Sequence, residues 1–288
     1  MSSKKRHIIN EVGKSFVQKM KNSFELGEKL NRPQTEKIAK QYNITDKTKI
    51  KELTELSIVE TARKIALSHE SNYDKYQSIV DLYKIQTNIS FRTSMSIMLQ
   101  QYSTPAPIGF LMGLYCGIET GDKIVFEPSA GNGLLTIAAH PSKVVVNEID
   151  DIRRANLYTQ GYKEVIGQDA SIEFRGFKKR FDAVITNPPF GRLDNPVYYD
   201  GFSISTLDHH MALIALSTMK VNGRAAIIIG GHTKWDEKGR VQKGSLRVFL
   251  NYLYSRYNVD DIIPINGSKL YSRQGTSFDT RLILIDGV

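Results

Sequence analysis

The sequence predicts an α/β fold in which a mostly parallel β-sheet follows a helical N-terminal region, with a domain boundary near residue 100. From residue 123 onward, short runs of β-branched residues alternate with helical stretches. Strands separated by helices form parallel sheets with right-handed crossovers. Residues 1–100 contain one proline and two glycines, so helix breakers are scarce there. The last two candidate strands have no helix between them, and we therefore expect an antiparallel last strand.

The elements of the second region, residues 101–288, follow from local composition and spacing. The expected strands are residues 123–126, 143–146, 181–186, 225–229, 261–265 and 281–285. The expected helices are residues 134–139, 151–160, 207–220 and 246–257.

The N-terminal region is expected to form helices with a break at residues 43–46. Apolar residues recur at helical spacing on both sides of the break, and Thr45 or Asp46 can cap the helix that follows. Residues 38–53 bear a weak likeness to a helix-turn-helix, which would place a basic helix against DNA. An ordinary helical hairpin packed on the next domain explains the same spacing. We favour the hairpin, because a single turn is a weak signal.

Composition excludes several classes of protein. The chain has 288 residues, 41% of them hydrophobic and 24% charged, as in a globular protein of one or two domains. No apolar stretch approaches the roughly 18–20 residues that span a bilayer, and the N-terminus leads into no apolar signal region. The single cysteine, Cys116, excludes an internal disulfide and a cysteine-rich zinc site. We expect a cytoplasmic protein with no metal and no membrane partner.

The net charge of +9 is concentrated near the N-terminus, where residues 1–100 hold 18 Lys and Arg against 11 Asp and Glu. Such a region could neutralise phosphates and release counterions. Lysine-rich helical faces are as often simply solvated. The charge distribution therefore leaves DNA contact by this region and plain solvation equally open.

A glycine-rich turn follows the first expected strand, and acidic residues follow at regular spacing. The turn, residues 126–135, contains Gly131 and Gly133 and lets a ligand approach the backbone closely. Glu148 lies 21 residues after Glu127, and Asp169 lies 21 residues further on. At the carboxyl edge of a parallel sheet, Glu148 can accept hydrogen bonds from both hydroxyls of a ribose, and Asp169 from an adenine amino group. Loop carboxylates without a ligand are the alternative.

The strand at 181–186 runs directly into Asn187-Pro188-Pro189-Phe190. Two prolines remove two backbone donors and stiffen this corner. The side-chain oxygen of Asn187 and the carbonyl of Pro188 can both accept from one exocyclic amino group, and Phe190 offers a flat face for a base. A structural proline turn with a core phenylalanine is the alternative.

These features form an ordered set of motifs. They are Gln101-Tyr-Ser-Thr-Pro-Ala-Pro, Glu127-Pro-Ser-Ala-Gly-Asn-Gly, Asn147-Glu-Ile-Asp, Asp169 and Asn187-Pro-Pro-Phe. The set resembles the S-adenosylmethionine-dependent DNA adenine N6-methyltransferases, and its order resembles their gamma arrangement. It is also similar to type I modification subunits of restriction-modification systems and to methyltransferases of phages and mobile elements. The resemblance covers about residues 100–288 and implies a Rossmann-like class I methyltransferase sheet.

The resemblance implies a role for each matching residue toward the cofactor, S-adenosylmethionine. The methionine end would be lined by Tyr102, Ser103 and Thr104. The floor would be formed by Glu127, Ser129, Ala130, Gly131 and Gly133. Glu148 would hold the ribose, Ile149 would lie against the adenine ring, and Asp169 would bind the adenine amino group. Asn187 would border both the cofactor and the target.

The resemblance also implies how the target would be bound. In the catalytic motif, formed by Asn187, Pro188, Pro189 and Phe190, the first two residues would accept from the target amino group and Phe190 would stack on the base. Two acceptors favour the pyramidal nitrogen that can attack a sulfonium methyl, with no covalent enzyme intermediate. A duplex adenine would first have to be flipped out of the stack.

The chain departs from the gamma pattern because it ends at Val288, just after the last expected strand, with no following target-recognition domain. We expect specificity to be low, to come from the N-terminal helices and two loops, or to come from a partner that is a specificity, nuclease or helicase subunit. The loops are expected at residues 191–206 and 231–245. Their basic and aromatic residues suit nucleic-acid contact as well as solvation: Arg192, Tyr198, Tyr199, Lys234, Trp235, Lys238, Arg240 and Lys243.

Two other functions remain open. Asn-Pro-Pro-aromatic motifs also occur in RNA guanine N2 and protein-glutamine methyltransferases, which act on planar amino groups. A noncatalytic DNA-binding subunit with the same fold is the other alternative. The Thr-Pro motif upstream of the glycine turn and the helical N-terminus favour DNA.

Overall fold

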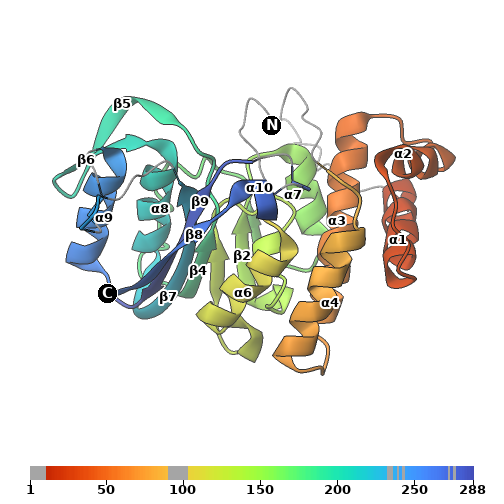
Figure 1. The fold of residues 1–288 in the computed structure, drawn as a ribbon, viewed down its shortest axis with the longest axis horizontal. Helices are drawn as coiled ribbons and strands as arrows, with labels where there is room; N and C mark the ends of the chain where they lie inside the picture. Colours follow the sequence, from red (N-terminus) through yellow and green to blue (C-terminus); the bar gives the residue numbers. More distant parts are fainter. Residues whose placement is uncertain are drawn as a thin grey trace, which may run out of the picture.

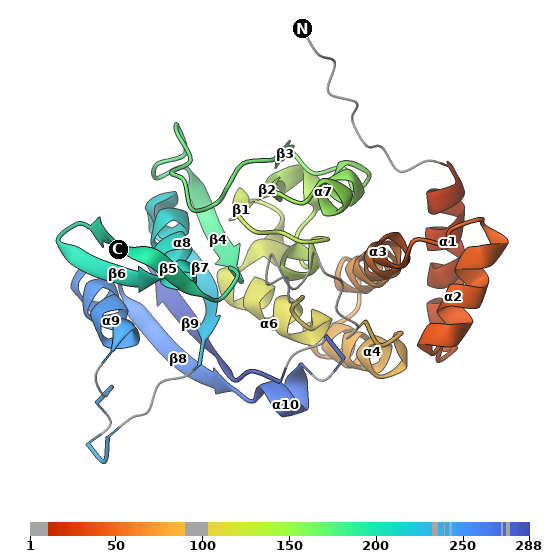
Figure 2. The same ribbon diagram turned by 90° about the horizontal axis from the view of Figure 1, so that it is seen from above.

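The computed structural model describes residues 11–89, 103–231, 236–238, 240–241, 244–271, 273–274 and 277–288. A central sheet has helices on both faces, and the N-terminal helices form a further layer at one side (Figure 1). Seen from above, this layer and the β5–β6 hairpin lie at opposite sides of the molecule (Figure 2).

The sheet has seven strands in the order β3-β2-β1-β4-β7-β9-β8. Strands β3, β2, β1, β4 and β7 run parallel, whereas β9 is antiparallel to both β7 and β8. The mostly parallel sheet with an antiparallel last strand is therefore confirmed. The strands are β1 (Val125–Glu127), β2 (Val144–Asn147), β3 (Glu164–Ile166), β4 (Phe181–Thr186), β7 (Met219–Gly230), β8 (Val259–Ile265) and β9 (Thr280–Asp286).

Alternate residues of the central strands enter two different hydrophobic cores. Val125 and Ala183 face one core, while their neighbours Phe126 and Val184 face the other. The continuous apolar strands of the sequence arise because a parallel sheet covered on both faces buries every side chain. The helices on the first face are α6 (Ala106–Cys116) and α7 (Asp151–Tyr158). The helices on the second face are α8 (Leu207–Ser217) and α9 (Ser245–Arg256).

The N-terminal layer consists of helices α1 (Glu11–Glu25), α2 (Arg32–Gln41), α3 (Lys47–Ala66) and α4 (Asn72–Ile85). The break between α2 and α3 lies where the sequence predicts it, and Asp46 rather than Thr45 caps α3 by accepting from the backbone of Lys49. Helix α3 buries 14 of its 20 residues. A helix buried in this way cannot lie in a DNA groove, so residues 38–53 form an ordinary helical hairpin.

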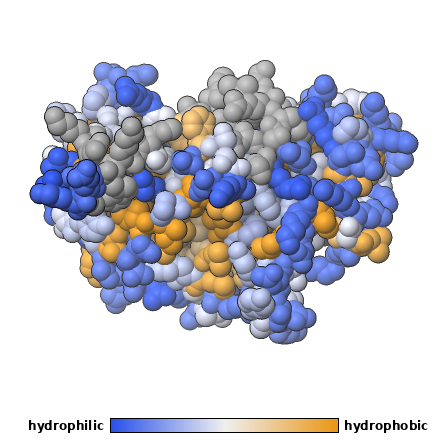
Figure 3. Space-filling view, viewed as in Figure 1, coloured by the Kyte–Doolittle hydropathy of each residue, from blue (hydrophilic) through white to orange (hydrophobic). Residues whose placement is uncertain are grey.

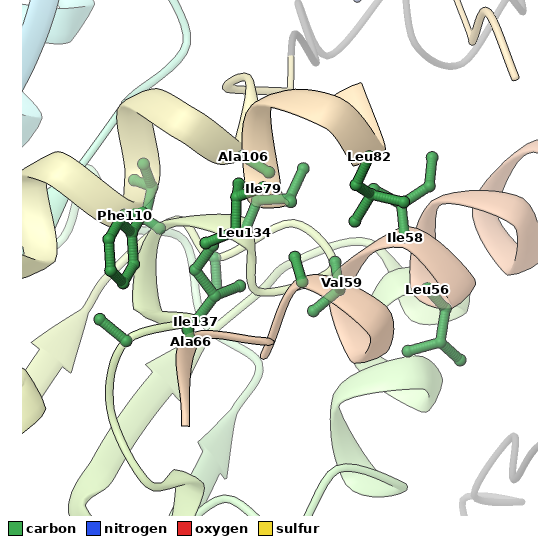
Figure 4. Close-up of a cluster of buried hydrophobic side chains, with 14 of the residues drawn as sticks. Leu56, Ile58, Val59, Ala66, Ile79, Leu82, Ala106, Phe110, Leu134 and Ile137 are labelled. Carbon is green, nitrogen blue, oxygen red and sulfur yellow. The ribbon is translucent and has the colours of Figure 1, made fainter. Parts of the chain in front are cut away.

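One hydrophobic core runs from the N-terminal layer to the sheet. Leu82 of α4 and Ala106 of α6 belong to the same cluster as Val59 and Leu134 (Figure 4). The division near residue 100 stays a prediction, and the apolar contacts are continuous across it. On the face seen in Figure 3, the surface over the N-terminal helices is mainly hydrophilic. No helix in the described part of the chain is both long and apolar enough to cross a membrane.

Two segments differ from the sequence prediction. The helix expected at 134–139 is only a 3₁₀ turn, Leu134–Thr136, because the segment between Gly133 and Pro141 is too short to propagate an α-helix and packs against α6. The loop expected at 191–206 is a hairpin of β5 (Arg192–Tyr199) and β6 (Phe202–Thr206). Asp200 and Gly201 both have positive φ, as a two-residue hairpin turn requires. Of the second loop, Lys234, Trp235 and Lys243 lie outside the described residues.

We expect Gly109→Ala to lower the free energy of unfolding, although alanine is favoured over glycine in helices by about 1 kcal/mol. A Cβ on Gly109 would lie 2.5 Å from the backbone oxygen of Leu134. Backbone cannot move aside as a flexible side chain can, and such overpacking typically costs about 1–3 kcal/mol. Urea denaturation measures the change, with Leu111→Ala at a half-exposed position of the same helix as the control. A Gly109→Ala protein as stable as the wild type would contradict this packing.

Candidate active site

A cavity of about 340 Å³ opens at the carboxyl ends of the parallel strands, within the usual size range of ligand sites. It lies where the strand order reverses between β1 and β4, the position at which open α/β sheets bind ligands. Of the residues predicted from the sequence, the following line it: Ser103, Thr104, Glu127, Ser129, Ala130, Gly131, Glu148, Ile149, Asp169, Asn187 and Pro189.

The glycine-rich turn is tied to the end of β2. The backbone N–H of Ala130 donates to the carbonyl of Asn147 at 2.9 Å, and that of Gly131 donates to Glu148 Oε2 at 2.7 Å. Gly131 has a φ of +57°, a backbone conformation that residues with a side chain rarely adopt. The turn therefore holds its backbone against the wall of the cavity.

Glu148 is held by two backbone donors. Besides Gly131, the N–H of Asp150 donates to Glu148 Oε1 at 2.8 Å. A carboxylate oxygen has two lone pairs, so each oxygen keeps the capacity to accept a second donor from a ligand. Burial raises the pKa of Glu148, and nearby Arg153 and the backbone donors oppose this rise. The carboxylate is thus fixed in orientation beside the cavity.

Asn147, to which the motif assigned no role, fixes two loops at this edge of the sheet. Its Nδ2 donates to the carbonyls of Pro128 and Gln168 at 2.9 and 3.0 Å, and its Oδ1 accepts from the N–H of Gln168 at 2.9 Å. The loops after β1 and β3 are therefore joined through the end of β2. The feature of the sequence that could have identified Asn147 is a polar residue at the end of an apolar strand, directly before Glu148.

Glu127 is buried at the floor of the cavity, with 1% of its surface exposed. Its Oε2 accepts from the hydroxyl of Thr136 at 3.1 Å, while its Oε1 has no hydrogen-bond partner among the described residues. Burial raises the pKa of Glu127 well above its ordinary value. A buried acceptor of this kind is costly unless a ligand supplies a donor or a positive charge.

The proline corner joins the cavity at its other end. Asn187 Nδ2 donates to Thr104 Oγ1 at 2.9 Å, which links the end of β4 to the segment before α6. The hydroxyls of Ser129 and Thr186 are 2.9 Å apart and link the turn after β1 to β4. The motifs at 103–107, 127–133 and 187–190 are therefore brought together at one edge.

Of the predicted site residues that the structure describes, three do not line the cavity. Tyr102 lies outside the described residues. Gly133 faces the other way, because a Cβ there would lie 2.2 Å from the hydroxyl of Tyr162. Pro188 is buried, and Phe190 is partly buried on the first core next to Gly230. Gly133 thus serves packing rather than the floor of the cavity.

The outer end of the cavity is more open. Ile149 is 52% exposed, and Asp169 is exposed at the rim, where its Oδ1 accepts from the N–H and hydroxyl of Ser171. Asp169 therefore keeps its second carboxylate oxygen for a ligand. Other cavity residues that the sequence argument missed are Glu55, Pro128, Asn132, Leu134, Leu135, Arg153, Gln168, Ala170, Ser171, Leu207 and Met211.

A buried polar network connects α3 to this site. Arg153 Nε of α7 donates to Glu52 Oε2 at 2.9 Å, and Asn132 Nδ2 donates to Glu52 and Glu55 at 2.7 Å each. Asn132 Oδ1 accepts from Asn156 at 2.7 Å. The glycine-rich turn is therefore held from two helices as well as from the sheet.

Among the described residues, no group of three or more His, Cys, Asp and Glu side chains is placed to hold a metal. At the start of α8, His209 is buried and stacks on Phe249 with ring centroids 4.3 Å apart. Burial lowers the pKa of His209. This histidine is a core residue.

Comparison with solved structures identifies the fold. A Listeria monocytogenes protein assigned to the class I S-adenosylmethionine-dependent methyltransferases aligns with a TM-score of 0.52 and 14% identity over 97% of this chain and 89% of its own. A chain from a type I R-M system aligns with a TM-score of 0.52 and 14% identity over 98% of this chain and 64% of its own. No protein-family profile and no curated protein matches the sequence. The chain has the Rossmann-like fold of class I methyltransferases.

The raised pKa of Glu127 predicts a particular pH dependence of stability. The folded chain without ligand holds this proton more tightly than the unfolded chain, so the contribution to stability is complete below the ordinary carboxyl pKa and is lost as pH rises through the raised pKa. The unfolding free energy of the wild type should therefore fall with rising pH more steeply than that of Glu127→Gln. The slopes should differ by up to about 1.4 kcal/mol per pH unit.

Urea denaturation between about pH 5 and pH 8, without ligand, tests this expectation. Glu70→Gln, at an exposed position, should keep the wild-type slope. Parallel curves for the wild type and Glu127→Gln would show that Glu127 is not held protonated in the folded chain.

Proposed function

We propose that the protein transfers a methyl group from S-adenosylmethionine to the N6 amino group of adenine in DNA. The observation that carries the proposal is the position of the Asn187-Pro-Pro-Phe corner, at the same edge of the sheet as the carboxylates of Glu127 and Glu148. One cavity would then receive a nucleoside cofactor and, at the proline corner, an amino group of a second base.

The chemistry of the cavity fits the cofactor. The buried Glu127 Oε1 calls for a donor or a cation, and S-adenosylmethionine carries both an ammonium and a sulfonium. Glu148 would accept from the ribose hydroxyls, and Asp169 at the rim would accept from the adenine amino group. Apolar side chains are available for the adenine ring on the same walls: Ile149, Ala170, Leu207 and Met211.

The cofactor, when bound, supplies an electrophilic methyl group. The chain would supply acceptors that orient the target amino group, because its nitrogen lone pair is delocalised into the ring and must be directed at the methyl. Asn187 donates its Nδ2 to Thr104, so the oxygen of the amide is the acceptor for the substrate, together with the carbonyl of Pro188. Catalysis would rest on positioning and on stabilising the charge that develops on nitrogen.

The target base would reach this corner by leaving its stack, which costs a few kcal/mol. Stacking on the partly buried Phe190 would offset about 1–3 kcal/mol of that cost. The β5–β6 hairpin follows this residue directly and carries Arg192 and Tyr198, the latter 80% exposed. A basic side chain at the base of this hairpin and an exposed aromatic side chain near its tip suit contact with a nucleic acid.

DNA is favoured over other carriers of an amino group by two observations. The type I R-M chain shares the fold over nearly the whole length of this chain, which supports DNA and separate partner subunits by analogy. The excess of positive charge in residues 1–100 suits phosphate contact. We extend the proposal to a DNA-contacting role for this region, alongside a methyltransferase domain at 101–288.

The substrate is tested with tritiated S-adenosylmethionine and unmethylated DNA, RNA and protein in parallel, followed by analysis of the labelled product. We expect N6-methyladenine in DNA. Label in RNA or in protein glutamine would replace the proposed substrate. Absence of transfer to all three, with the cofactor bound, would favour a noncatalytic subunit.

Asn187→Ala should reduce methyl transfer on the order of 10²-fold or more, because one of two acceptors for the amino group is lost. Affinity for S-adenosylhomocysteine, measured by calorimetry, should stay within a few-fold of the wild type. Asn222→Ala, an exposed asparagine on β7, serves as the matched control and should behave as the wild type. Full activity of Asn187→Ala would remove its catalytic role.

Glu148→Ala should weaken binding of S-adenosylhomocysteine roughly 10- to 100-fold, since hydrogen bonds to a charged group contribute about 1.5–3 kcal/mol. Calorimetry measures the change directly. Glu164→Ala, an exposed glutamate on the neighbouring strand β3, is the control and should leave the affinity unchanged. Equal affinities of Glu148→Ala and the wild type would exclude the ribose contact.

A further inference from the structure

Glu55 of helix α3 lines the cavity although it lies far upstream of every motif that the sequence argument used. Its side chain is 1% exposed. Its Oε2 accepts from Asn132 Nδ2 at 2.7 Å, which places the carboxylate beside the glycine-rich turn. Ser103 also hydrogen-bonds to it, and Ser103 lines the same cavity. Glu55 therefore belongs to the wall that the turn shares with the segment before α6.

The carboxylate of Glu52 has a cationic partner in an ion pair, whereas that of Glu55 has none among the described ion pairs. Glu52, one turn earlier on α3, pairs with Arg153 at 2.9 Å. Among the ion pairs of the described residues, none includes Glu55. Burial and the neighbouring Glu52 raise the pKa of Glu55, and Arg153, Ser103 and Lys51 oppose this rise. A buried carboxyl without a cation of its own is a site at which a cationic ligand group gains binding energy.

A second observation points to the same ligand group. Glu127, which also lines the cavity, has a buried oxygen without a partner among the described residues. Two buried carboxyl groups thus face one cavity, one from α3 and one from β1. An ammonium has three donors and a full positive charge, so it suits a cavity with buried carboxyl groups on its walls.

We propose that Glu55 binds the α-ammonium of the amino-acid end of the cofactor, so that helix α3 completes the cofactor site. The proposal rests on the cofactor named above. The motif resemblance assigns Ser103 and Thr104 to the amino-acid end of the cofactor and Ile149 and Asp169 to its adenine end, and all four residues line the cavity. The N-terminal layer then contributes a ligand contact besides any contact with nucleic acid.

The test compares how two proteins bind two ligands. The ligands are S-adenosylhomocysteine and its analogue in which hydrogen replaces the α-amino group. Calorimetry gives the four dissociation constants for the wild type and Glu55→Gln, whose amide can still contact Asn132. Glu60→Gln is the matched control, because Glu60 lies on the same helix and pairs with Lys21 at 2.8 Å.

We expect Glu55→Gln to weaken S-adenosylhomocysteine about 10-fold or more and the deaminated analogue less than about 2-fold. Glu60→Gln should change neither. Equal weakening of both ligands would overturn the proposal, since Glu55 would then only support the turn. Failure of the wild type to bind either ligand would instead overturn the proposed cofactor.

A second measurement does not need Glu55→Gln and applies even if that variant fails to fold. Calorimetry of both ligands at about pH 5.5, in buffers of different ionisation enthalpy, gives the protons released on binding. An ammonium beside Glu55 lowers its pKa, so S-adenosylhomocysteine should release more protons than the deaminated analogue. The groups around Glu55 are Glu52 and Lys51 on α3, Arg153 on α7 and Ser103. Glu127 faces the same cavity and would also lose a proton beside an ammonium, so the measurement is repeated on Glu127→Gln, where the difference between the two ligands should remain. Equal proton release would contradict the proposal.

Discussion

The buried ion pair between Glu52 of α3 and Arg153 of α7 is the interaction on which the cavity depends. Both side chains are almost fully removed from solvent, and each charge is tolerable only because the other is present. Asn132 of the glycine-rich turn donates to the same carboxylate, so the turn is placed by this pair. Loss of one partner of a buried pair typically costs about 3–5 kcal/mol. The same ion pair therefore stabilises both the N-terminal layer and the cavity.

The sequence predicted those parts of the fold and site that depend on local pattern. Apolar strands between helices predicted the sheet, and carboxylates at strand ends predicted that Glu127 and Glu148 would meet at one edge. The roles of Glu55 and Asn132 could not be predicted, because they arise from contacts between residues about 80 positions apart in the chain. The position of Glu55 along α3 does not differ in spacing from that of a glutamate on the surface of a helix.

Other differences came from competing local signals. The glycine at 133 matched a cofactor motif, but its positive φ and its contact with Tyr162 show that packing requires it. The pair Asp200-Gly201 is a strong hairpin signal, and it lies in the segment 191–206 for which a loop was expected. The hairpin is held by Tyr252 of α9, whose ring lies 5.6 Å from Tyr199 and 5.3 Å from Phe202. Such anchoring is not visible in the sequence of the hairpin itself.

The core shared by α3, α4 and α6 has a consequence for the order of folding. The apolar faces of α3 and α4 are covered in part by α6, which leaves the ribosome later. Loop closure must occur before such distant contacts stabilise the chain, so folds of this kind form slowly. During synthesis α3 and α4 expose these parts of their faces until α6 has emerged. The nascent chain therefore passes through a stage at which it can aggregate, before any part of the cavity exists.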